Sequence, residues 1–209
     1  MTIIAVDGPA ASGKGTIARS LAKHYGLPHM DTGLLYRAAA LNLWRWGGDP
    51  GNEFEAVRAA QELNLDADDP ELRSEPVSRI ASAISAYPQV RSVLLKRQQD
   101  FAHQAGGAVL DGRDIGTVIA PDADVKLFVT AAAEVRAERR MRELEQRGMH
   151  ATFEDVLADI RSRDERDSNR EAAPLTQAPD ALRLDTSEMN AEEAVAAALR
   201  MVEDRLTEA

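Results

Sequence analysis

The stretch GPAASGKGT, Gly8 to Thr16, decides the fold of this 209-residue chain. It nearly fits the phosphate-loop rule, in which a Gly-rich turn ends in Gly-Lys followed by Ser or Thr. The position after Lys14 holds Gly15 instead, so the first hydroxyl is that of Thr16. The strand-like run IIAVD precedes the loop and a helical pattern from Lys14 to Tyr25 follows it, as the rule requires. We therefore expect a phosphate loop here; the competing interpretation is a plain Gly-rich turn.

Short apolar runs alternate with longer helical patterns along the rest of the chain. The runs lie at residues 2–6, 27–30, 108–110, 125–129 and 182–184. Such alternation is typical of a parallel sheet covered by helices, an α/β fold. In the helix after the loop we expect Ile17 and Leu21 to face the sheet and Gly26 to end the helix. Asn190, with Glu193 three residues later, predicts a capping box that opens a final helix.

Two segments are expected to lie outside the sheet and to move. Residues 48–75 are acidic and rich in turn residues, which indicates a small insertion before a helix near 76–86. Residues 147–172 contain a charged helical pattern that stops before Pro174.

Composition excludes several classes of protein. The formal charge of −10 argues against binding long nucleic acid, because such binding depends on neutralising phosphates with Lys and Arg. The absence of Cys excludes disulfides and thiolate zinc sites and suits a reducing compartment. No apolar run approaches the roughly 18 residues of a membrane span, and MTIIAVDG has no basic leader. We expect a cytoplasmic protein with no membrane partner, and a monomer by default.

The segment DTGLLYRAAA carries groups that suit a second anion. It places Thr32 at the start of a helix and Arg37 one turn inside it. A helix N-terminus, a hydroxyl and a guanidinium together favour a negatively charged ligand. Ordinary capping by Asp31 or Thr32, with Arg37 in solvent, is the alternative.

The segment AVLDGRDIGTV places three charged residues just beyond a buried strand. Asp111, Arg113 and Asp114 are expected at the carboxyl edge of the sheet, where open α/β sheets bind ligands. The alternative is an Asp-Gly turn with solvated charges.

The segment RSRDERDSNREAAPL is rich in Arg. Arg163, Arg166 and Arg170 are spaced i, i+3 and i+7, so we expect them on one helical face. Like charges so arranged repel each other unless an anion or carboxylates intervene. A solvated ladder of Asp159–Arg163 and Arg163–Asp167 pairs is the alternative.

Taken together, GPAASGKGT, DTGLLYRA, YPQVRSVLL, DGRDIGTV and RDERDSNREAAPL resemble bacterial cytidylate kinases, in the nucleoside monophosphate kinase family, from residue 2 to about 185. In that family the order GKGT is normal. The resemblance implies one three-layer domain of the P-loop NTPase type with a five-stranded parallel sheet, a nucleotide-binding insertion and a short helical lid. The core would comprise 1–47, 88–146 and 173–209, the insertion about 48–87 and the lid about 147–172. The family's insertion usually holds a small antiparallel sheet, but ELNLDADDPELRSEPVSRI shows little strand alternation, so we expect an incomplete sheet.

The same resemblance assigns the site residues. ATP would be bound by Gly8, Pro9, Ala10, Ala11, Ser12, Gly13, Lys14, Gly15 and Thr16. CMP would be bound by Thr32, Arg37, Ser82, Arg91, Arg113, Asp114, Arg163, Asp167 and Arg170. The catalytic residues would be Lys14, Arg113, Arg163 and Arg170, and Mg²⁺ would meet Thr16 and, through water, Asp111.

The implied reaction transfers the terminal phosphoryl group of ATP to CMP or dCMP. The chemistry agrees, because cytosine offers an amine for a carboxylate such as Asp114, and acceptors for Arg91 and Ser82. Two alternatives remain: a kinase for another monophosphate such as UMP or AMP, and a non-enzymatic nucleotide-controlled switch. No NKxD guanine-reading motif occurs in the sequence.

Overall fold

All five predicted strands form, and all pair in parallel. The computed structural model describes residues 1–208. The strands are β1 (Thr2–Asp7), β2 (His29–Asp31), β3 (Gly107–Gly112), β4 (Val125–Thr130) and β5 (Leu182–Asp185). Their order across the sheet is β2-β3-β1-β4-β5, which confirms the α/β fold. The register pairs Asp7 with Gly112, so the loop after β1 and the turn after β3 leave the sheet side by side.

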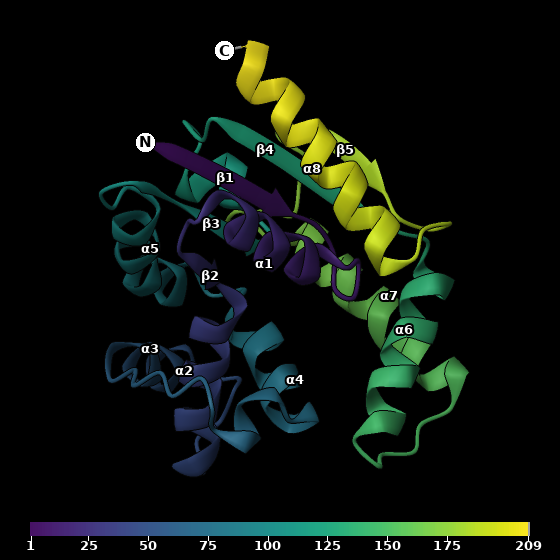
Figure 1. Ribbon diagram of the computed structural model, residues 1–209. Coiled ribbons are helices and arrows are strands. Elements are labelled where there is room, and N and C mark those ends of the chain that lie inside the picture. The colour runs from purple at the N-terminus through teal and green to yellow at the C-terminus, as the bar shows by residue number, and fades with distance from the viewer. Residues whose placement is uncertain (209) are drawn as a thin grey trace.

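Helices cover both faces of the sheet (Figure 1). The helices α1 (Lys14–Tyr25) and α8 (Ala191–Glu208) share one apolar cluster with the sheet, to which Ile17 and Leu21 contribute as expected. The helix α5 (Pro88–Ala102) and the short turn η2 (Ile115–Ile119) belong to the cluster on the other face. The predicted end of α1 and start of α8 are confirmed: Gly26 adopts a left-handed conformation, and Asn190 and Glu193 exchange the two hydrogen bonds of a capping box.

Five helical segments build a further apolar cluster beside the sheet. They are α2 (Gly33–Arg45), α3 (Glu53–Gln61), η1 (Pro70–Arg73), α4 (Glu75–Ile84) and, through Val90 and Leu94, α5. The predicted helix near 76–86 is α4, whereas α3 was not predicted. Residues 48–87 contain helices and turns but no strand.

The helices α6 (Ala133–Gln146) and α7 (Phe153–Asn169) pack against each other and extend away from the sheet (Figure 1). The charged helix expected within 147–172 is α7. The expectation that Arg170 shares a helical face with Arg163 and Arg166 is wrong. Arg170 lies just past the end of α7, where its backbone is extended (ψ 143°). Of the helices within residues 1–208, none has both the length and the apolar character that a bilayer span needs.

Candidate active site

The loop between β1 and α1 is shaped by close backbone packing. Gly8 and Gly13 have positive φ angles of 154° and 91°, and Ala11 also lies in the left-handed region at 57°. A Cβ atom on Gly8 would lie 2.0 Å from the carbonyl oxygen of Val129 in β4. The loop can therefore pass β4 only with glycine at this position.

Two arginines of α6 hold the carbonyl groups of this loop. Arg136 donates to the carbonyl of Ala10 at 3.3 Å, and Arg139 donates to that of Ser12, also at 3.3 Å. The hydroxyl of Thr186 donates to the same Ser12 carbonyl at 3.0 Å. Because these carbonyls are bonded to other elements, the loop has a fixed shape. These contacts span more than a hundred positions, and no local pattern indicates them.

Lys14 is buried at the end of the loop. Its Nζ donates to the carbonyl of Pro9 at 3.1 Å. Burial, and then the nearby Arg113, lower the pKa of Lys14 to about 7. An ammonium group is thus disfavoured here unless an anion accompanies it.

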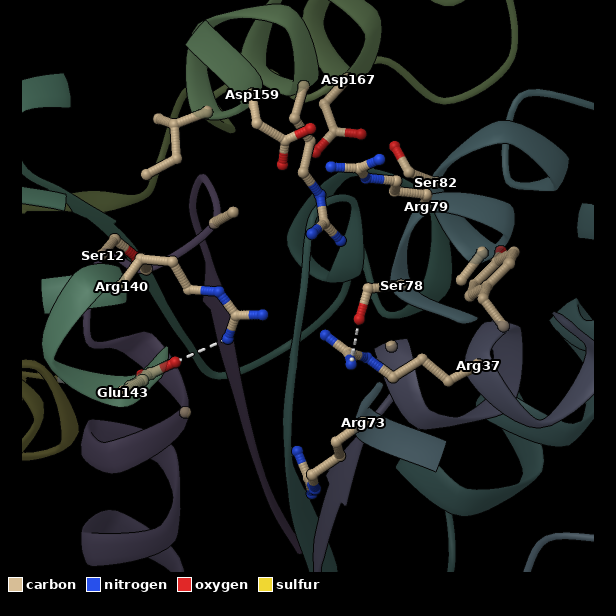
Figure 2. Close-up of a pocket in the computed structure, with 18 of the residues that line it drawn as sticks. Ser12, Arg37, Arg73, Ser78, Arg79, Ser82, Arg140, Glu143, Asp159 and Asp167 are labelled. Atoms are coloured by element: carbon tan, nitrogen blue, oxygen red, sulfur yellow. Dashed lines mark hydrogen bonds and ion pairs between the residues drawn. The ribbon is translucent and has the colours of Figure 1, made fainter. Parts of the chain in front are cut away.

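A cavity of about 900 Å³ extends from this loop to α4, α5 and α7. Figure 2 shows its walls, with Arg37, Ser78 and Ser82 on one side, Arg140 on the other, and Asp159 and Asp167 projecting from α7. Every residue that the sequence analysis assigned to the site lines this cavity, except Gly8 and Pro9. Segments distant in the chain are therefore brought around one space.

At the far end of the cavity Asp114 lies between two guanidinium groups. Its Oδ2 accepts from Arg91 at 2.5 Å, and its Oδ1 lies 3.6 Å from Arg170. Arg91 also donates to the carbonyl of Ser85 and lies over the ring of Tyr36. In the same region the buried hydroxyl of Ser82 has no hydrogen-bond partner within residues 1–208. This end offers a carboxylate, a guanidinium and a free hydroxyl, a set that can read the polar edge of a base.

The middle of the cavity is strongly positive. Arg113 donates to Asp167 of α7 at 2.7 Å. Arg37 bonds only to the hydroxyl of Ser78 in the described chain, at 2.8 Å, and burial lowers its pKa to about 10. Burial, and then Arg113, lower the pKa of Arg163 to about 10, and its buried Nε has no partner in the described part of the chain. Buried guanidinium groups that lack carboxylates are suited to bind phosphate.

The expected alternatives at two positions are not observed. No ion pair within 4.0 Å joins Arg163 to Asp159 or Asp167 over residues 1–208, so the solvated ladder does not form. Thr32 begins α2 without a side-chain cap, because its hydroxyl donates to the carbonyl of Asp111 at 2.9 Å and joins β3 to α2.

Two oxygen-bearing side chains near Lys14 suit a hard cation. The hydroxyl of Thr16 is exposed at the start of α1, and the carboxylate of Asp111 lies close to Gly15. Within residues 1–208 no cluster of three metal-binding side chains occurs. This donor set fits Mg²⁺, which is commonly held by one or two protein oxygens together with substrate phosphates and water.

Several residues of the site were not foreseen from the sequence. They are Asp7, Asp31, Arg73, Arg79 and Arg140, which lie at or near the cavity, and His29, which contacts Asp111 at 2.7 Å. Arg140 also forms an ion pair with Glu75 and thereby joins α6 to α4. Only their charge distinguishes these residues in the sequence, and many surface residues carry the same charge.

The parallel sheet, the loop with its buried lysine and the arginine-lined cavity define a phosphate-loop kinase. The chain belongs to the cytidylate kinase family, whose sequence model matches residues 4–204. It is 58% identical to the cytidylate kinase of Xanthobacter autotrophicus, over 97% of this chain and 98% of that protein. It is 56% identical to the cytidylate kinase of Methylocella silvestris, over 96% and 94% of the two chains. The resemblance found in the sequence is thus confirmed.

A gluconokinase from Sinorhizobium meliloti 1021 has a similar fold. Its solved structure superposes with a TM-score of 0.51 over 100% of this chain and 97% of that one, at 16% identity. This likeness supports the phosphate-loop kinase fold alone.

Proposed function

We propose that this protein transfers the terminal phosphoryl group of ATP to CMP or dCMP, giving ADP and CDP or dCDP. One observation carries the proposal: a single cavity connects the phosphate loop to the hydroxyl of Ser82, the guanidinium of Arg91 and the carboxylate of Asp114, which lie 68 to 100 positions beyond Lys14 in the chain. A volume of about 900 Å³ can hold the reacting parts of two nucleotides. Membership of the cytidylate kinase family supports the same assignment.

The base of the acceptor would be read by Asp114, Arg91 and Ser82. The carboxylate of Asp114 accepts from the amine of cytosine, while Arg91 and Ser82 donate to its O2 and N3 atoms. Uracil presents a carbonyl where cytosine has the amine, so it would face the carboxylate with an acceptor. This difference would favour CMP over UMP.

No protein base is required for the transfer. The second pKa of a phosphate monoester is about 6, so the attacking oxygen is already largely ionised at pH 7. The difficulty is the repulsion between two anionic substrates, which Lys14, Arg113 and Arg163 would neutralise during the in-line transfer. Arg37 would hold the phosphate of the acceptor, and Arg170 and Asp167 would contact its ribose and phosphates. Mg²⁺, held by Thr16 and through water by Asp111, would supply further positive charge to the phosphates.

Residues 48–87 would form an insertion that covers the acceptor, and residues 147–172 a lid. Closure would exclude water, which otherwise would hydrolyse ATP. The ion pairs of Arg113 with Asp167 and of Arg140 with Glu75 support this role, since they join the core to α7 and α6 to α4.

We also propose that the protein acts as a cytoplasmic monomer. The monomer agrees with a cavity whose assigned side chains all come from one chain. The cytoplasm agrees with the absence of Cys, since proteins of oxidising compartments often contain disulfides. Light scattering of the purified protein, with and without both nucleotides, tests the oligomeric state.

An ADP-release assay with CMP, dCMP, UMP and AMP as acceptors tests the reaction. We expect the highest kcat/KM with CMP or dCMP, and no transfer by Lys14→Ala. Asp114→Ala should lower kcat/KM for CMP much more than it weakens ATP binding. A protein that binds ATP but releases no ADP with any acceptor would contradict the proposal.

A further inference from the structure

Asp7, the last residue of β1, joins the phosphate loop to the turn that follows β3. Its carboxylate is 5% exposed. Its Oδ1 accepts from the backbone N–H of Ile115 and its Oδ2 from that of Gly116, both at 2.8 Å. These two N–H groups open η2, the turn that begins directly after Arg113 and Asp114. A carboxylate from one end of the chain thus caps a helical turn 108 residues away.

The two bonds fix the backbone on the C-terminal side of Asp114. The carbonyl of Asp114 accepts from Val118 at 2.9 Å and from Ile119 at 3.2 Å. The peptide group after Asp114 is therefore held at both ends, by its carbonyl oxygen and by the N–H of Ile115. The buried side chains of Ile115 and Ile119 anchor the same turn in the core. With the backbone held, the side chain of Asp114 starts from a fixed point, and its carboxylate lies between Arg91 and Arg170.

Only Asp satisfies this arrangement. Two neighbouring N–H groups need two acceptor oxygens on one short side chain, and Asn would place its own N–H₂ against one of the donors. The carboxylate is retained although burial raises the pKa of Asp7 to about 6 against the opposing effect of the two N–H groups. Lys14 also favours the charged form, but it comes after the two N–H groups in size, and its Nζ donates to the carbonyl of Pro9. The two backbone N–H groups are therefore the main stabilisers of the charge.

We propose that Asp7 is a positioning residue for acceptor selectivity: by bonding the N–H groups of Ile115 and Gly116, it holds Asp114 where its carboxylate meets cytosine. The inference rests on the proposed function, since it concerns how the base-reading carboxylate is placed. Asp7 contacts no substrate itself, as it does not line the cavity.

The test compares kcat/KM for CMP with kcat/KM for UMP in wild type, Asp7→Asn and Asp114→Asn. The two acceptors carry the same phosphate, so general damage to the site lowers both values and leaves their ratio unchanged. We expect Asp7→Asn to lower the CMP to UMP ratio about tenfold, since one of two charge-assisted bonds is lost and a donor faces a donor. Asp114→Asn should lower the ratio at least as much.

Asp124→Asn is a matched control. Asp124 accepts from the N–H of Ile3 at 2.7 Å, so it holds the opposite end of β1 by the same kind of bond, away from the cavity. We expect this variant to lose thermal stability without a change in the ratio. Should Asp7→Asn fail to fold, Asp7→Ser, whose hydroxyl can accept one of the two N–H groups, is expected to give a ratio between those of wild type and Asp114→Asn.

The outcomes separate the inference from the function on which it rests. A normal ratio in Asp7→Asn or Asp7→Ser, with a lowered ratio in Asp114→Asn, overturns the role of Asp7. A normal ratio in Asp114→Asn overturns the base-reading role and the inference with it. Absence of transfer to CMP by the wild type contradicts the proposed function.

Discussion

The ion pair between Arg113 and Asp167 is one of two largely buried pairs that attach α7 to the core, the other being Arg136 with Asp164. The side chains of Arg113 and Asp167 are 16% and 6% exposed, and Nε of Arg113 lies 2.7 Å from Oδ2 of Asp167. The pair of Arg161 with Glu134 joins α7 to α6 at the same 2.7 Å, but these side chains are 61% and 52% exposed. The pairs of Asp167 and of Glu134 therefore differ in burial and not in distance.

Asp167→Asn should destabilise the protein by about 3 kcal/mol, because removing one partner of a buried ion pair leaves the other charge uncompensated. For a chain of this length that loss corresponds to a decrease in Tm of about 6–12 °C. Glu134→Gln should leave Tm almost unchanged, because solvent screens the exposed pair. Thermal unfolding followed by circular dichroism measures both variants.

The pH dependence provides a second measurement of the same pair. Burial acts to raise the pKa of Asp167, but Arg113, with Arg163 and Arg170, outweighs it, and the pKa is lowered. A carboxylate with a lowered pKa contributes stability above its unfolded pKa and loses that contribution as the pH falls through its folded pKa. The difference in Tm between wild type and Asp167→Asn should therefore be constant from pH 7 to 5 and decrease below about pH 4. Equal effects of Asp167→Asn and Glu134→Gln at pH 7 would refute the assignment of this difference to burial.

Three further variants test other contacts. Gly8→Ala should lower the free energy of unfolding in urea by at least ~3 kcal/mol, because its Cβ would lie 2.0 Å from the Val129 carbonyl oxygen; a near-normal midpoint would show that β4 can shift. Lys14→Met should lower kcat at least ~100-fold while Tm stays constant or rises, because burial already lowers the pKa of this ammonium to about 7; a large fall in Tm would instead indicate a structural role. Glu75→Gln should speed amide exchange in η1 and α4, because it breaks the ion pair with Arg140 that joins α4 to α6; exchange that increases equally in α5 would contradict a local effect.

The sequence predicted the sheet well, because each strand is a short apolar run between turn residues. It missed α3, whose acidic residues were taken as part of a turn-rich insertion. A signal was present in Asn52 with Glu55 three residues later: the side chain of Asn52 accepts from the N–H groups of Phe54 and Glu55 and caps α3, and its amide donates to the carboxylate of Glu55. The same spacing of Asn and Glu was recognised at Asn190, where an apolar helix follows it.

The sequence indicated which residues line the cavity, but it did not indicate which groups those residues bond to. Spacing along a helix suggested partners for Arg163 within four residues, but its neighbours in space include Arg113, from a different element. The hydroxyl of Thr32 bonds to a carbonyl 79 residues away, and Asp7, at the end of β1, caps the turn that follows β3. Such contacts depend on the order and register of the strands, which a single sequence does not specify.

The placement of charge would favour the proposed closure when both substrates are bound. A chain with a formal charge of −10 concentrates Lys14, Arg37, Arg113 and Arg163 around one cavity. Burial lowers the pKa of Lys14, Arg37 and Arg163, so this arrangement holds positive charge at a cost in free energy. Under the proposed function, phosphates of ATP would offset the cost near Lys14, and the phosphate of the acceptor would offset it near Arg37. A ligand shifts a conformational equilibrium only by its differential affinity for the two states. The proposed closure would therefore be favoured most when both anions are present, which is also when ATP has an acceptor other than water.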